Sequence, residues 1–572
     1  MRSLGGDGLG LSGDLSHWHP EAEGTALREV TLGGLLAEQA AHHPDRTAIM
    51  FDGPDGDVSW TYARLDAEAD RIAAAAVAAG LRPGERAALL APNGPEWVLL
   101  EYGLARAGVV LVTVNPAFRE SEIAYLLAQG QVAALFTVGA HRGFDLGALL
   151  AAMVPARDGV PLPGGRFPAL RLLVGIGPDP VPGALCWAKF AARADGVDPA
   201  ALRARADAVR PEDVIQIQYT SGTTGQPKGA MLTHRGTVNN ALLAAGRAGY
   251  RAEDVMVSAM PLFHTAGCVC NVMGMLAAGG TLVAMRDFDA DRMLELMARH
   301  RATVTNAVPT MYVRLLAAEG FGTADLSAWR LAYVGGTSIP PSLMRELHAR
   351  AGCEPVIIMG MTECSPIITQ TRLDEPLESR VEAAGTPLPH VELRLADPAT
   401  GATVPLGAEG ELLIRGFGVT PGYFDMPERT AKAIDAEGWL RSGDLAVMDP
   451  AGRLRIIGRI KDMLIRGGEN IYPVEIEDRL LEHPDIAEAQ VVGVPDPEMG
   501  EEVFAFVVPR GGRALDGAAL RDWCRARMAR HKVPRHVAVI PETPKTANGK
   551  VRKVELREAA ARHVAAIGEG AA

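Results

Sequence analysis

Short β-branched runs alternate with longer helical stretches along much of this chain, and few folds accommodate that rhythm. Between residues 86 and 138 the runs RAALLA, VVLVTVN and VAALFTV are separated by helical patterns over 96–107 and 120–128. The alternation resumes at residue 254 and continues to PVIIMG at 355–360. Strands that are joined through helices pair in parallel and are covered on both faces. The sequence therefore predicts an α/β fold with large, mostly parallel sheets.

The length of the chain predicts more than one domain, because 572 residues exceed what one hydrophobic core usually supports. After residue 458 the pattern becomes shorter and more charged, with a helix at 474–481 and strands at 489–494 and 502–508. We expect a small α+β domain there. Residues 1–28 are interpreted as a loose leader, and the Pro- and Gly-rich residues 141–210 as a surface excursion.

Charge and cysteine usage exclude several classes of protein. The formal net charge is −12 and no long Lys/Arg run appears, so nucleic acid is not an expected partner. The six cysteines lack CxxC spacing, which indicates neither a zinc site nor a disulfide framework and fits a reducing cytoplasm. No apolar run reaches the roughly 18 residues of a spanning helix, and the start of the chain does not read as a secretory signal.

A Gly- and Thr-rich string, YTSGTTGQPKG at 219–229, follows the apolar run DVIQIQ. Glycines let backbone N–H groups approach an anion, and hydroxyls and a lysine add further donors. The spacing differs from GxxxxGK[ST], so a P-loop kinase or ATPase loses its main support. The string predicts a loop that binds a triphosphate, although a flexible turn has the same composition. Its candidate ligands are Thr220, Ser221, Gly222, Thr223, Thr224, Gly225 and Lys228.

The whole string resembles the signature of the acyl-adenylate-forming (AMP-binding) superfamily, which includes acyl-CoA synthetases, peptide-synthetase adenylation domains and luciferases. Further segments match in order: PLFHTAG at 261–267, GMTE at 360–363, SGDLA at 442–446, GRIKD at 458–462 and PKTANGK at 544–550. The resemblance spans roughly residues 30–560. It implies a large AMP-binding domain over 29–458, a hinge at 459–461 and a small mobile lid domain over 462–572.

The resemblance also implies roles for residues around the nucleotide. Thr362 would contact the α-phosphate, and Glu363 would hold Mg²⁺, for which a carboxylate is an apt ligand. Asp444 would accept hydrogen bonds from the ribose hydroxyls, and Arg459 would contact ribose or phosphate. Taken singly, these acids and this arginine could equally be solvated surface groups, helix caps or members of a surface ion pair.

The resemblance also assigns two lysines and two glycines to the hinge and the small C-terminal domain. Lys461 matches the hinge residue, and Lys550 matches a lysine that touches carboxylate and α-phosphate oxygens during adenylation. Gly467 and Gly468 would line the CoA tunnel for the pantetheine arm. The alternatives are an exposed loop lysine for Lys550 and a simple tight turn for the glycines.

The acyl pocket and the adenine site are matched less closely. His264 would orient the carboxylate, and Gly335 and Gly336 would form the pocket wall; a buried core histidine and a strand-end turn are the alternatives. Met359 stands before Gly360 where the family has an aromatic residue against the adenine. Methionine can cover a purine face but offers no flat ring, which bears on ATP affinity.

The reaction implied is ATP-dependent ligation of a carboxylic acid to CoA through an acyl-AMP, with Mg²⁺ as cofactor. PLFHTAGCVCNVMGM at 261–275 holds no acid that could pair an α-ammonium, so an amino acid is not expected, and a medium- or long-chain fatty acid is favoured. Three alternatives stay open: an aryl-acid CoA ligase, an enzyme that loads a carrier-protein phosphopantetheine, and a catalytically silent nucleotide-binding relative. A homodimer is compatible with the sequence.

Overall fold

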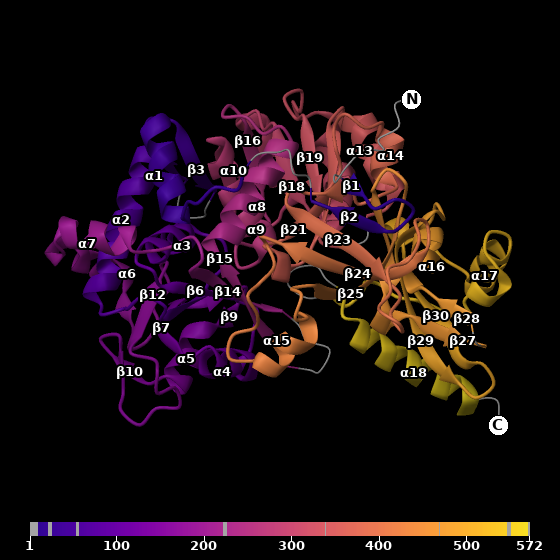
Figure 1. Cartoon of the computed structure of the whole chain (residues 1–572). Helices are drawn as coiled ribbons and strands as arrows, with labels where there is room; N and C mark the ends of the chain where they lie inside the picture. The colour runs from indigo at the N-terminus through magenta and orange to yellow at the C-terminus, as the bar shows by residue number, and fades with distance from the viewer. Residues whose placement is uncertain are drawn as a thin grey trace.

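The computed structural model describes residues 10–20, 26–52, 57–220, 226–337, 339–467, 469–545 and 551–569. Within these residues, two large mixed sheets, one antiparallel sheet and a smaller C-terminal sheet form the framework (Figure 1). The α/β class expected from the alternating pattern is confirmed.

The first large sheet has seven strands in the order β13-β12-β7-β5-β6-β14-β15. Neighbouring strands run parallel up to β14, and β15 closes the edge antiparallel. Both β6 and β7 are buried along their whole length, as expected for strands covered on both faces. The strands are β5 (Arg86–Leu90), β6 (Val110–Val114), β7 (Val132–Val138), β12 (Leu172–Ile176), β13 (Leu185–Cys186), β14 (Val214–Thr220) and β15 (Lys228–Thr233).

The second large sheet has nine strands in the order β22-β21-β20-β19-β18-β16-β17-β3-β4. Its central strands, β20 to β3 in that order, pair in parallel, and antiparallel strands close both edges. The strands are β3 (Thr47–Asp52), β4 (Val58–Thr61), β16 (Val255–Ser258), β17 (Thr281–Met285), β18 (Val304–Ala307), β19 (Leu331–Val334), β20 (Glu354–Gly360), β21 (Ile367–Gln370) and β22 (Thr386–Pro387).

Helices pack between and outside these sheets, and side-chain caps or prolines fix where many of them begin. Thr31, Thr61 and Thr233 each accept a backbone N–H three residues ahead, which starts α1, α2 and α8. Helix α8 contacts β15 of the first sheet and β21 of the second, so it belongs to the layer between them. Helices of the large part are α1 (Leu32–His42), α2 (Tyr62–Ala78), α3 (Pro95–Arg106), α4 (Glu120–Gln129), α5 (Leu146–Met153), α6 (Trp187–Ala191), α7 (Pro199–Asp207), α8 (His234–Arg247), α9 (Thr265–Gly267), α10 (Gly274–Ala278), α11 (Ala290–Arg299), α12 (Pro309–Ala317), α13 (Pro341–Ala351), α14 (Leu377–Val381) and α15 (Pro427–Ala433).

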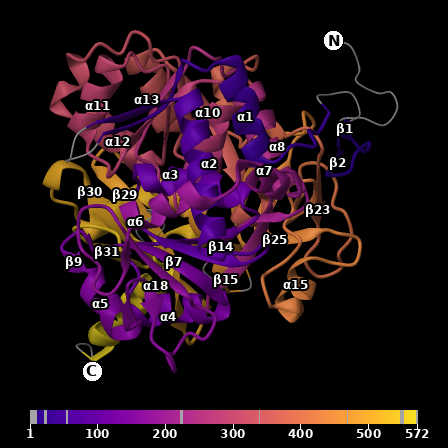
Figure 2. The same ribbon diagram turned by 90° about the vertical axis from the view of Figure 1, so that its left-hand side faces the viewer.

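A third sheet is antiparallel and has six strands in the order β1-β2-β23-β24-β25-β26. The indigo strands β1 and β2 lie beside the orange strand β23 in Figures 1 and 2, although they are far apart in the sequence. The strands are β1 (Gly10–Leu11), β2 (His17–His19), β23 (Val391–Ala396), β24 (Glu409–Gly416), β25 (Leu440–Met448) and β26 (Leu454–Arg459). The loose-leader interpretation of residues 1–28 is therefore wrong for residues 10–20.

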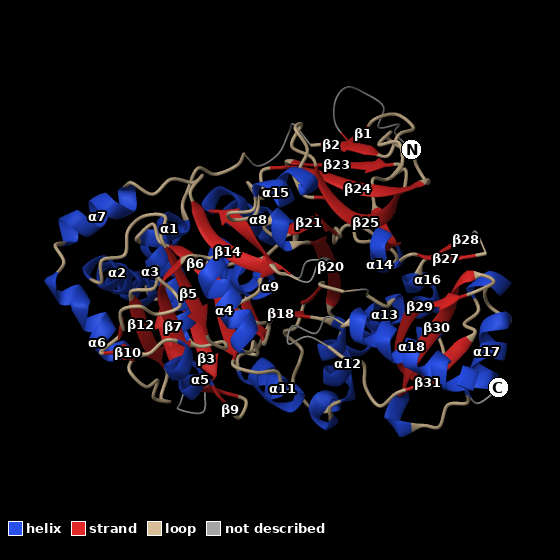
Figure 3. Ribbon diagram, turned by 90° about the horizontal axis from the view of Figure 1, so that it is seen from below, coloured by secondary structure: helices blue, strands red, loops and turns tan. Residues whose placement is uncertain are grey.

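The C-terminal part has its own five-stranded sheet, in which β28, β27, β30 and β29 follow one another and β31 pairs with β30. It lies at one end of the molecule, with α6 and α7 at the other (Figure 3). Its apolar clusters are separate from those of the large sheets. Its elements are β27 (Leu464–Arg466), β28 (Glu469–Ile471), α16 (Pro473–Leu481), β29 (Ile486–Asp496), β30 (Gly500–Pro509), α17 (Gly517–Arg525), β31 (His536–Val539) and α18 (Lys553–Glu569).

The predicted surface excursion over 141–210 contains one core strand. Residues 172–176 form β12, which pairs with β7 and is mostly buried. The surrounding hairpins, β8 (Ala140–His141) with β9 (Phe144–Asp145) and β10 (Ala156–Arg157) with β11 (Val160–Pro161), are short. None of the described helices combines the length and apolar character that crossing a membrane requires.

Candidate active site

A chain of hydrogen bonds joins three segments at the edge where β14, β15 and β20 end or begin. The Lys228 Nζ donates to the Tyr423 hydroxyl at 2.9 Å, and that hydroxyl donates to Glu363 Oε1 at 3.0 Å. Thr220 Oγ1 donates to the same carboxylate oxygen at 3.3 Å. Glu363 is 5% exposed, in a 3-10 turn, η4 (Thr362–Cys364), that follows β20. Three of the predicted ligands are thus brought together.

The side chains of Lys228 and Lys461 are partly buried, so water does not fully solvate their ammonium groups. Burial, and then the neighbouring Arg429 and Lys461, lower the pKa of Lys228, while Glu363 acts in the opposite direction. Burial likewise lowers the pKa of Lys461, with Arg459 as a further cause. Cations that lie close together and lack full hydration attract a polyanion strongly. The site is therefore suited to a phosphate chain.

Asp444 and Arg459 are cross-strand partners on β25 and β26. Asp444 Oδ1 lies 2.7 Å from Arg459 Nε, and Asp444 is buried whereas about half of the Arg459 side chain is exposed. The carboxylate is held in place by the sheet, while the guanidinium reaches toward solvent. Lys461 lies just beyond, in the 3-10 turn η5 (Ile460–Asp462).

Close backbone contact explains why a glycine stands at position 360. A Cβ on Gly360 would lie 2.0 Å from the carbonyl oxygen of Pro366, so any side chain would displace β20 from β21. The strand pairing shifts register between Met359 and Gly360. This bend directs the chain into the turn that carries Thr362, which is 7% exposed.

The predicted acyl-pocket residues lie in two places, before α9 and just after β19, and each has a local structural role. His264 caps α9: its Nδ1 accepts the Ala266 N–H at 3.2 Å. Gly335 packs against β20, since a Cβ there would lie 2.6 Å from Ile358 Cγ1. Gly336 has φ +90°, a conformation that favours glycine. Contact of these three residues with an acid stays a prediction.

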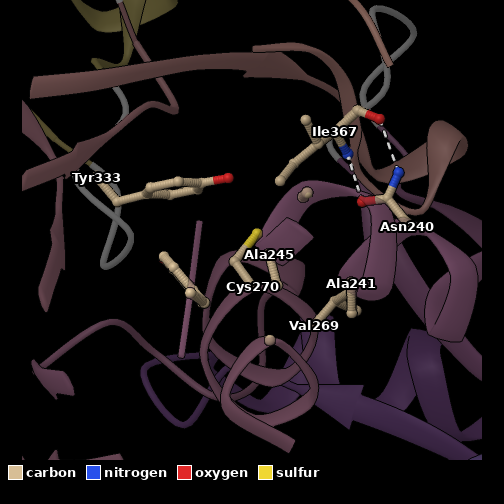
Figure 4. A pocket seen from close by; sticks show the side chains of 10 residues that line it. Asn240, Ala241, Ala245, Val269, Cys270, Tyr333 and Ile367 are labelled. Carbon is tan, nitrogen blue, oxygen red and sulfur yellow. Dashed lines mark hydrogen bonds between the residues drawn. The ribbon is translucent and has the colours of Figure 1, made fainter. Parts of the chain in front are cut away.

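A small cavity lies among the same segments. Figure 4 shows Tyr333 on one side of it and Ile367 and Asn240 on the other, with Cys270 between them. The Asn240 side chain bonds both the N–H and the carbonyl of Ile367, at 3.1 and 2.7 Å. The lining residues are Asn240, Ala241, Ala244, Ala245, Tyr250, Val269, Cys270, Gly274, Tyr333 and Ile367.

Several predicted site residues lie outside the part of the chain that the structure describes: Ser221, Gly222, Thr223, Thr224, Gly225, Gly468 and Lys550. Gly467 is described and has φ +59°; its N–H bonds the Met499 carbonyl at 2.8 Å. That geometry is a tight turn, one of the two readings given for this position. Its role as a lining of the CoA tunnel stays a prediction.

Sequence reasoning missed Tyr423, which links Lys228 to Glu363. It stands in the string TPGYFD at 420–425, where two aromatic residues follow a Pro-Gly pair. Burial, and secondarily the adjacent Glu363 charge, raises the pKa of the Tyr423 hydroxyl, which stays protonated as a donor. The cavity residues Val269, Cys270 and Tyr333 were missed too, although each lies within six residues of a predicted position.

Two family profiles match this chain, and together they cover most of it. Residues 36–424 match "AMP-binding enzyme", and residues 475–550 match "AMP-binding enzyme C-terminal domain". The first match contains the cluster around Glu363. The second lies within the C-terminal part that has its own sheet.

Named proteins and solved structures resemble the chain over nearly its whole length. The putative acyl-CoA synthetase YngI of Bacillus subtilis is 39% identical over 533 residues, 92% of this chain and 96% of that protein. The mitochondrial medium-chain acyl-CoA ligase ACSF2 of Mus musculus is 34% identical over 94% of this chain and 89% of its own. The structure of the anthranilate CoA ligase AuaEII with anthranoyl-AMP has a TM-score of 0.81 and 27% identity, and covers 95% of this chain and 99% of that one.

Proposed function

The chain belongs to the family of AMP-binding enzymes, and we propose that it joins a medium-chain fatty acid to CoA at the expense of ATP. It is an acid:CoA ligase of the acyl-CoA synthetase class, which favours an active enzyme over the catalytically silent alternative. The observation that carries the proposal for the site is the buried cluster of Thr220, Lys228, Glu363 and Tyr423.

The reaction has two transfers. In the first, a carboxylate oxygen of the acid bonds to the α-phosphorus of ATP as the bond to pyrophosphate breaks. In the second, the CoA sulfur bonds to the acyl carbon, the thiol proton is lost, and AMP leaves with the carboxylate-derived oxygen. Both steps build negative charge on oxygen atoms of the leaving group, so positioning and preorganised donors contribute most of the catalysis.

Phosphate binding is assigned to the loop from Thr220 to Gly225 and to Lys228. Backbone N–H groups of the loop and the Lys228 ammonium would hold the β- and γ-phosphates. Thr362 and Lys550 would contact the α-phosphate, where negative charge accumulates during adenylation. The lowered pKa values of Lys228 and Lys461 support this assignment, because a phosphate chain would add countercharge to that of Glu363, Asp444 and Asp462.

Mg²⁺ fits the oxygen donors beside this loop. The Glu363 carboxylate and the Thr220 hydroxyl lie within 3.3 Å of each other, and oxygen atoms are the ligands that Mg²⁺ prefers. Glu363 would hold the ion, with Tyr423 orienting the carboxylate. When bound, Mg²⁺ would neutralise phosphate charge and position the pyrophosphate for departure.

The nucleoside would be held by residues on β20 and β25. Asp444, fixed by its place in the sheet, would accept the ribose hydroxyls while sharing its charge with Arg459. Met359 and Gly360 would lie against the adenine. Because Arg459 is half exposed, its guanidinium can also turn to a phosphate without exposing a buried cation.

An apolar acyl tail suits the cavity shown in Figure 4. Its lining has no Asp, Glu, Lys or Arg, and small residues of α8 such as Ala241 and Ala245 leave room on one side. The cavity is formed by the segments that carry His264 and Gly335. The medium-chain class is proposed from the resemblance to the medium-chain acyl-CoA ligase ACSF2.

An aryl acid is the second candidate, and one observation favours it. The rings of Tyr250 and Tyr333 border the cavity with their centroids 5.8 Å apart. Aromatic side chains that border a cavity can hold an aryl ring by edge or offset contact. The resemblance to an anthranilate CoA ligase adds to this reading.

Transfer to the thiol would require the C-terminal part to turn about Lys461. The contacts that such a turn must rearrange include the hydrogen bond from Tyr472 to Glu409 of β24, at 2.8 Å. The turn would bring Gly467 and Gly468 to the pantetheine path. Free CoA is the proposed acceptor. A carrier-protein phosphopantetheine is the alternative acceptor, because its arm is the same.

Pyrophosphate release measured with Mg·ATP and a panel of short, medium and long fatty acids, aryl acids and amino acids tests the proposal. Each acid is assayed with CoA, with a phosphopantetheinylated carrier protein and with neither. Sustained release that needs CoA and is strongest with a medium-chain acid supports the function. If release is strongest with an aryl acid, the substrate is an aryl acid and not a fatty acid. If turnover occurs with the carrier protein and not with CoA, the acceptor is the carrier protein.

A further inference from the structure

The N-terminal hairpin places two histidines beside a buried glutamate, on the sheet edge opposite Arg459. Strand β2 pairs antiparallel with β23, with His17 opposite Arg394 and Trp18 opposite Leu393. Side chains alternate along a strand, so His17 and His19 share one face and Trp18 lies on the other. The same register brings Glu392 of β23 across from His19.

The three side chains converge on one point. Glu392 Oε1 lies 2.9 Å from His17 Nε2 and 3.7 Å from His19 Nδ1. One ligand atom from each residue lies within 4.8 Å of the others. A divalent ion bound at about 2.0–2.2 Å by nitrogen and oxygen spaces tetrahedral ligands roughly 3.4 Å apart. The donor atoms therefore already have the separations of a ligand set.

We propose that His17, His19 and Glu392 form a binding site for a divalent transition-metal ion of the zinc class. Two imidazoles with one carboxylate suit Zn²⁺, Co²⁺ or Ni²⁺ and not Mg²⁺ or Ca²⁺, which prefer oxygen ligands throughout. The ion fastens the hairpin to β23. This site is separate from Glu363, and it does not depend on the ligase function.

Neighbouring groups hold the ligands in place. Arg415 bonds Glu392 Oε2 at 2.6 Å, so Oε1 is the oxygen that faces the histidines. Ser12 Oγ lies 2.6 Å from the other ring nitrogen of His19, and such an outer partner fixes the orientation of a ligating imidazole. Glu392 is 7% exposed, which keeps its carboxylate from rotating freely into solvent.

Two arginines, Arg394 and Arg415, lie on this face, and both make cation–π contacts with the ring of Trp439. The guanidinium carbons of Arg394 and Arg415 lie 4.9 and 4.6 Å from the ring centroid of Trp439. A cation over an indole face is stabilised by the ring. His17 contacts the same ring edge to face, with centroids 5.9 Å apart, which limits the positions that its imidazole can take.

The test is zinc binding by the untagged, chelator-treated full chain, without nucleotide and in a Cys186→Ser background that removes an exposed thiol. Zn²⁺ is titrated in competition with a chromophoric indicator. One tightly bound ion per chain is expected. His19→Gln and Glu392→Gln should each weaken binding at least tenfold, and Ser12→Ala, which keeps all three ligands, should weaken it less.

His42→Gln is the matched control, because it removes an exposed histidine outside the cluster and should leave zinc affinity unchanged. Circular dichroism and pyrophosphate release check that each variant is folded. Zinc should also raise the apparent Tm of the parent protein and not that of Glu392→Gln. Absence of a stoichiometric ion overturns the proposal, as do His19→Gln and Glu392→Gln variants that bind zinc as tightly as His42→Gln does.

Discussion

The Tyr423 hydroxyl donates to Glu363 Oε1 at 3.0 Å. A tyrosine that follows a Pro-Gly pair therefore orients the carboxylate proposed to bind Mg²⁺. The same hydroxyl accepts from Lys228, so one oxygen orders both an acid and a cation of the nucleotide site. Neither charge can move without breaking a hydrogen bond to a protonated, buried phenol.

Tyr423→Phe should lower kcat/KM for ATP in pyrophosphate release about 10- to 100-fold, because a hydrogen bond to a charged group contributes about 1.5–3 kcal/mol. The requirement for Mg²⁺ should rise as well, since Glu363 loses its orienting donor. Tyr62→Phe is the control: it loses a buried hydroxyl that donates to the Gly280 carbonyl at 2.7 Å, far along the chain from the site. Equal ATP kinetics in the two variants would remove Tyr423 from the mechanism.

Lys550→Ala should slow adenylation by about 10² to 10³, the usual cost of losing one preorganised donor. Thiolation from supplied acyl-AMP should change much less, because the lysine acts on the α-phosphate during the first transfer. The two half-reactions are measured separately, as pyrophosphate release and as acyl-CoA formation. An equal loss in both would assign Lys550 to folding or to domain movement.

Ala245→Leu should shift preference toward shorter acids, because its added carbons enter the cavity bordered by Cys270 and Tyr333. The difference of even one methylene in such a pocket changes kcat/KM about tenfold or more. The expected result is a raised KM for the longest accepted acid with little change for the shortest. Ala63→Leu, on the exposed face of α2, is the control. An unchanged chain-length profile would place the acyl tail elsewhere.

Glu101→Gln should stabilise the protein at neutral and alkaline pH. Glu101 is 1% exposed and accepts from Gln216 at 2.7 Å, and burial raises its pKa. A raised folded-state pKa means that this acid's contribution to stability is complete below the usual glutamate pKa and is lost as the pH rises through the folded value. Glutamine cannot ionise and avoids that loss.

The check is the apparent Tm of parent and Glu101→Gln proteins between pH 5 and pH 9, with the difference expected to grow with pH. Glu253→Gln, an exposed carboxylate, should show no such trend. A difference that is constant or that shrinks with pH would mean that Glu101 is ionised in the folded protein.

Local periodicity predicted β5, β6 and β7 of the first large sheet and β16 to β20 of the second. The run VAALFTV at 132–138 coincides with β7, and TLVAM at 281–285 with β17. Strand β12 was missed because LLVGI at 172–176 stands among prolines and glycines and depends on its pairing with β7.

The site was predictable only where motif and contact coincide. Thr220, Lys228 and Glu363 stand in motifs recognisable in the sequence. In the structure Thr220 bonds Glu363 directly, and Tyr423 links Glu363 to Lys228. Tyr423 could not be foreseen, because its importance lies in contacts with residues 195 and 60 positions away. The same holds for His17 and Glu392, which are 375 positions apart.

The hairpin of residues 10–19 has a practical consequence, because the family match begins only at residue 36. A protein truncated so that it begins at residue 36 would leave β23 as an open strand edge, with unpaired N–H and C=O groups along it. Such edges recruit strands from other molecules. The shortened protein would therefore tend to aggregate even though every residue assigned to catalysis is still present.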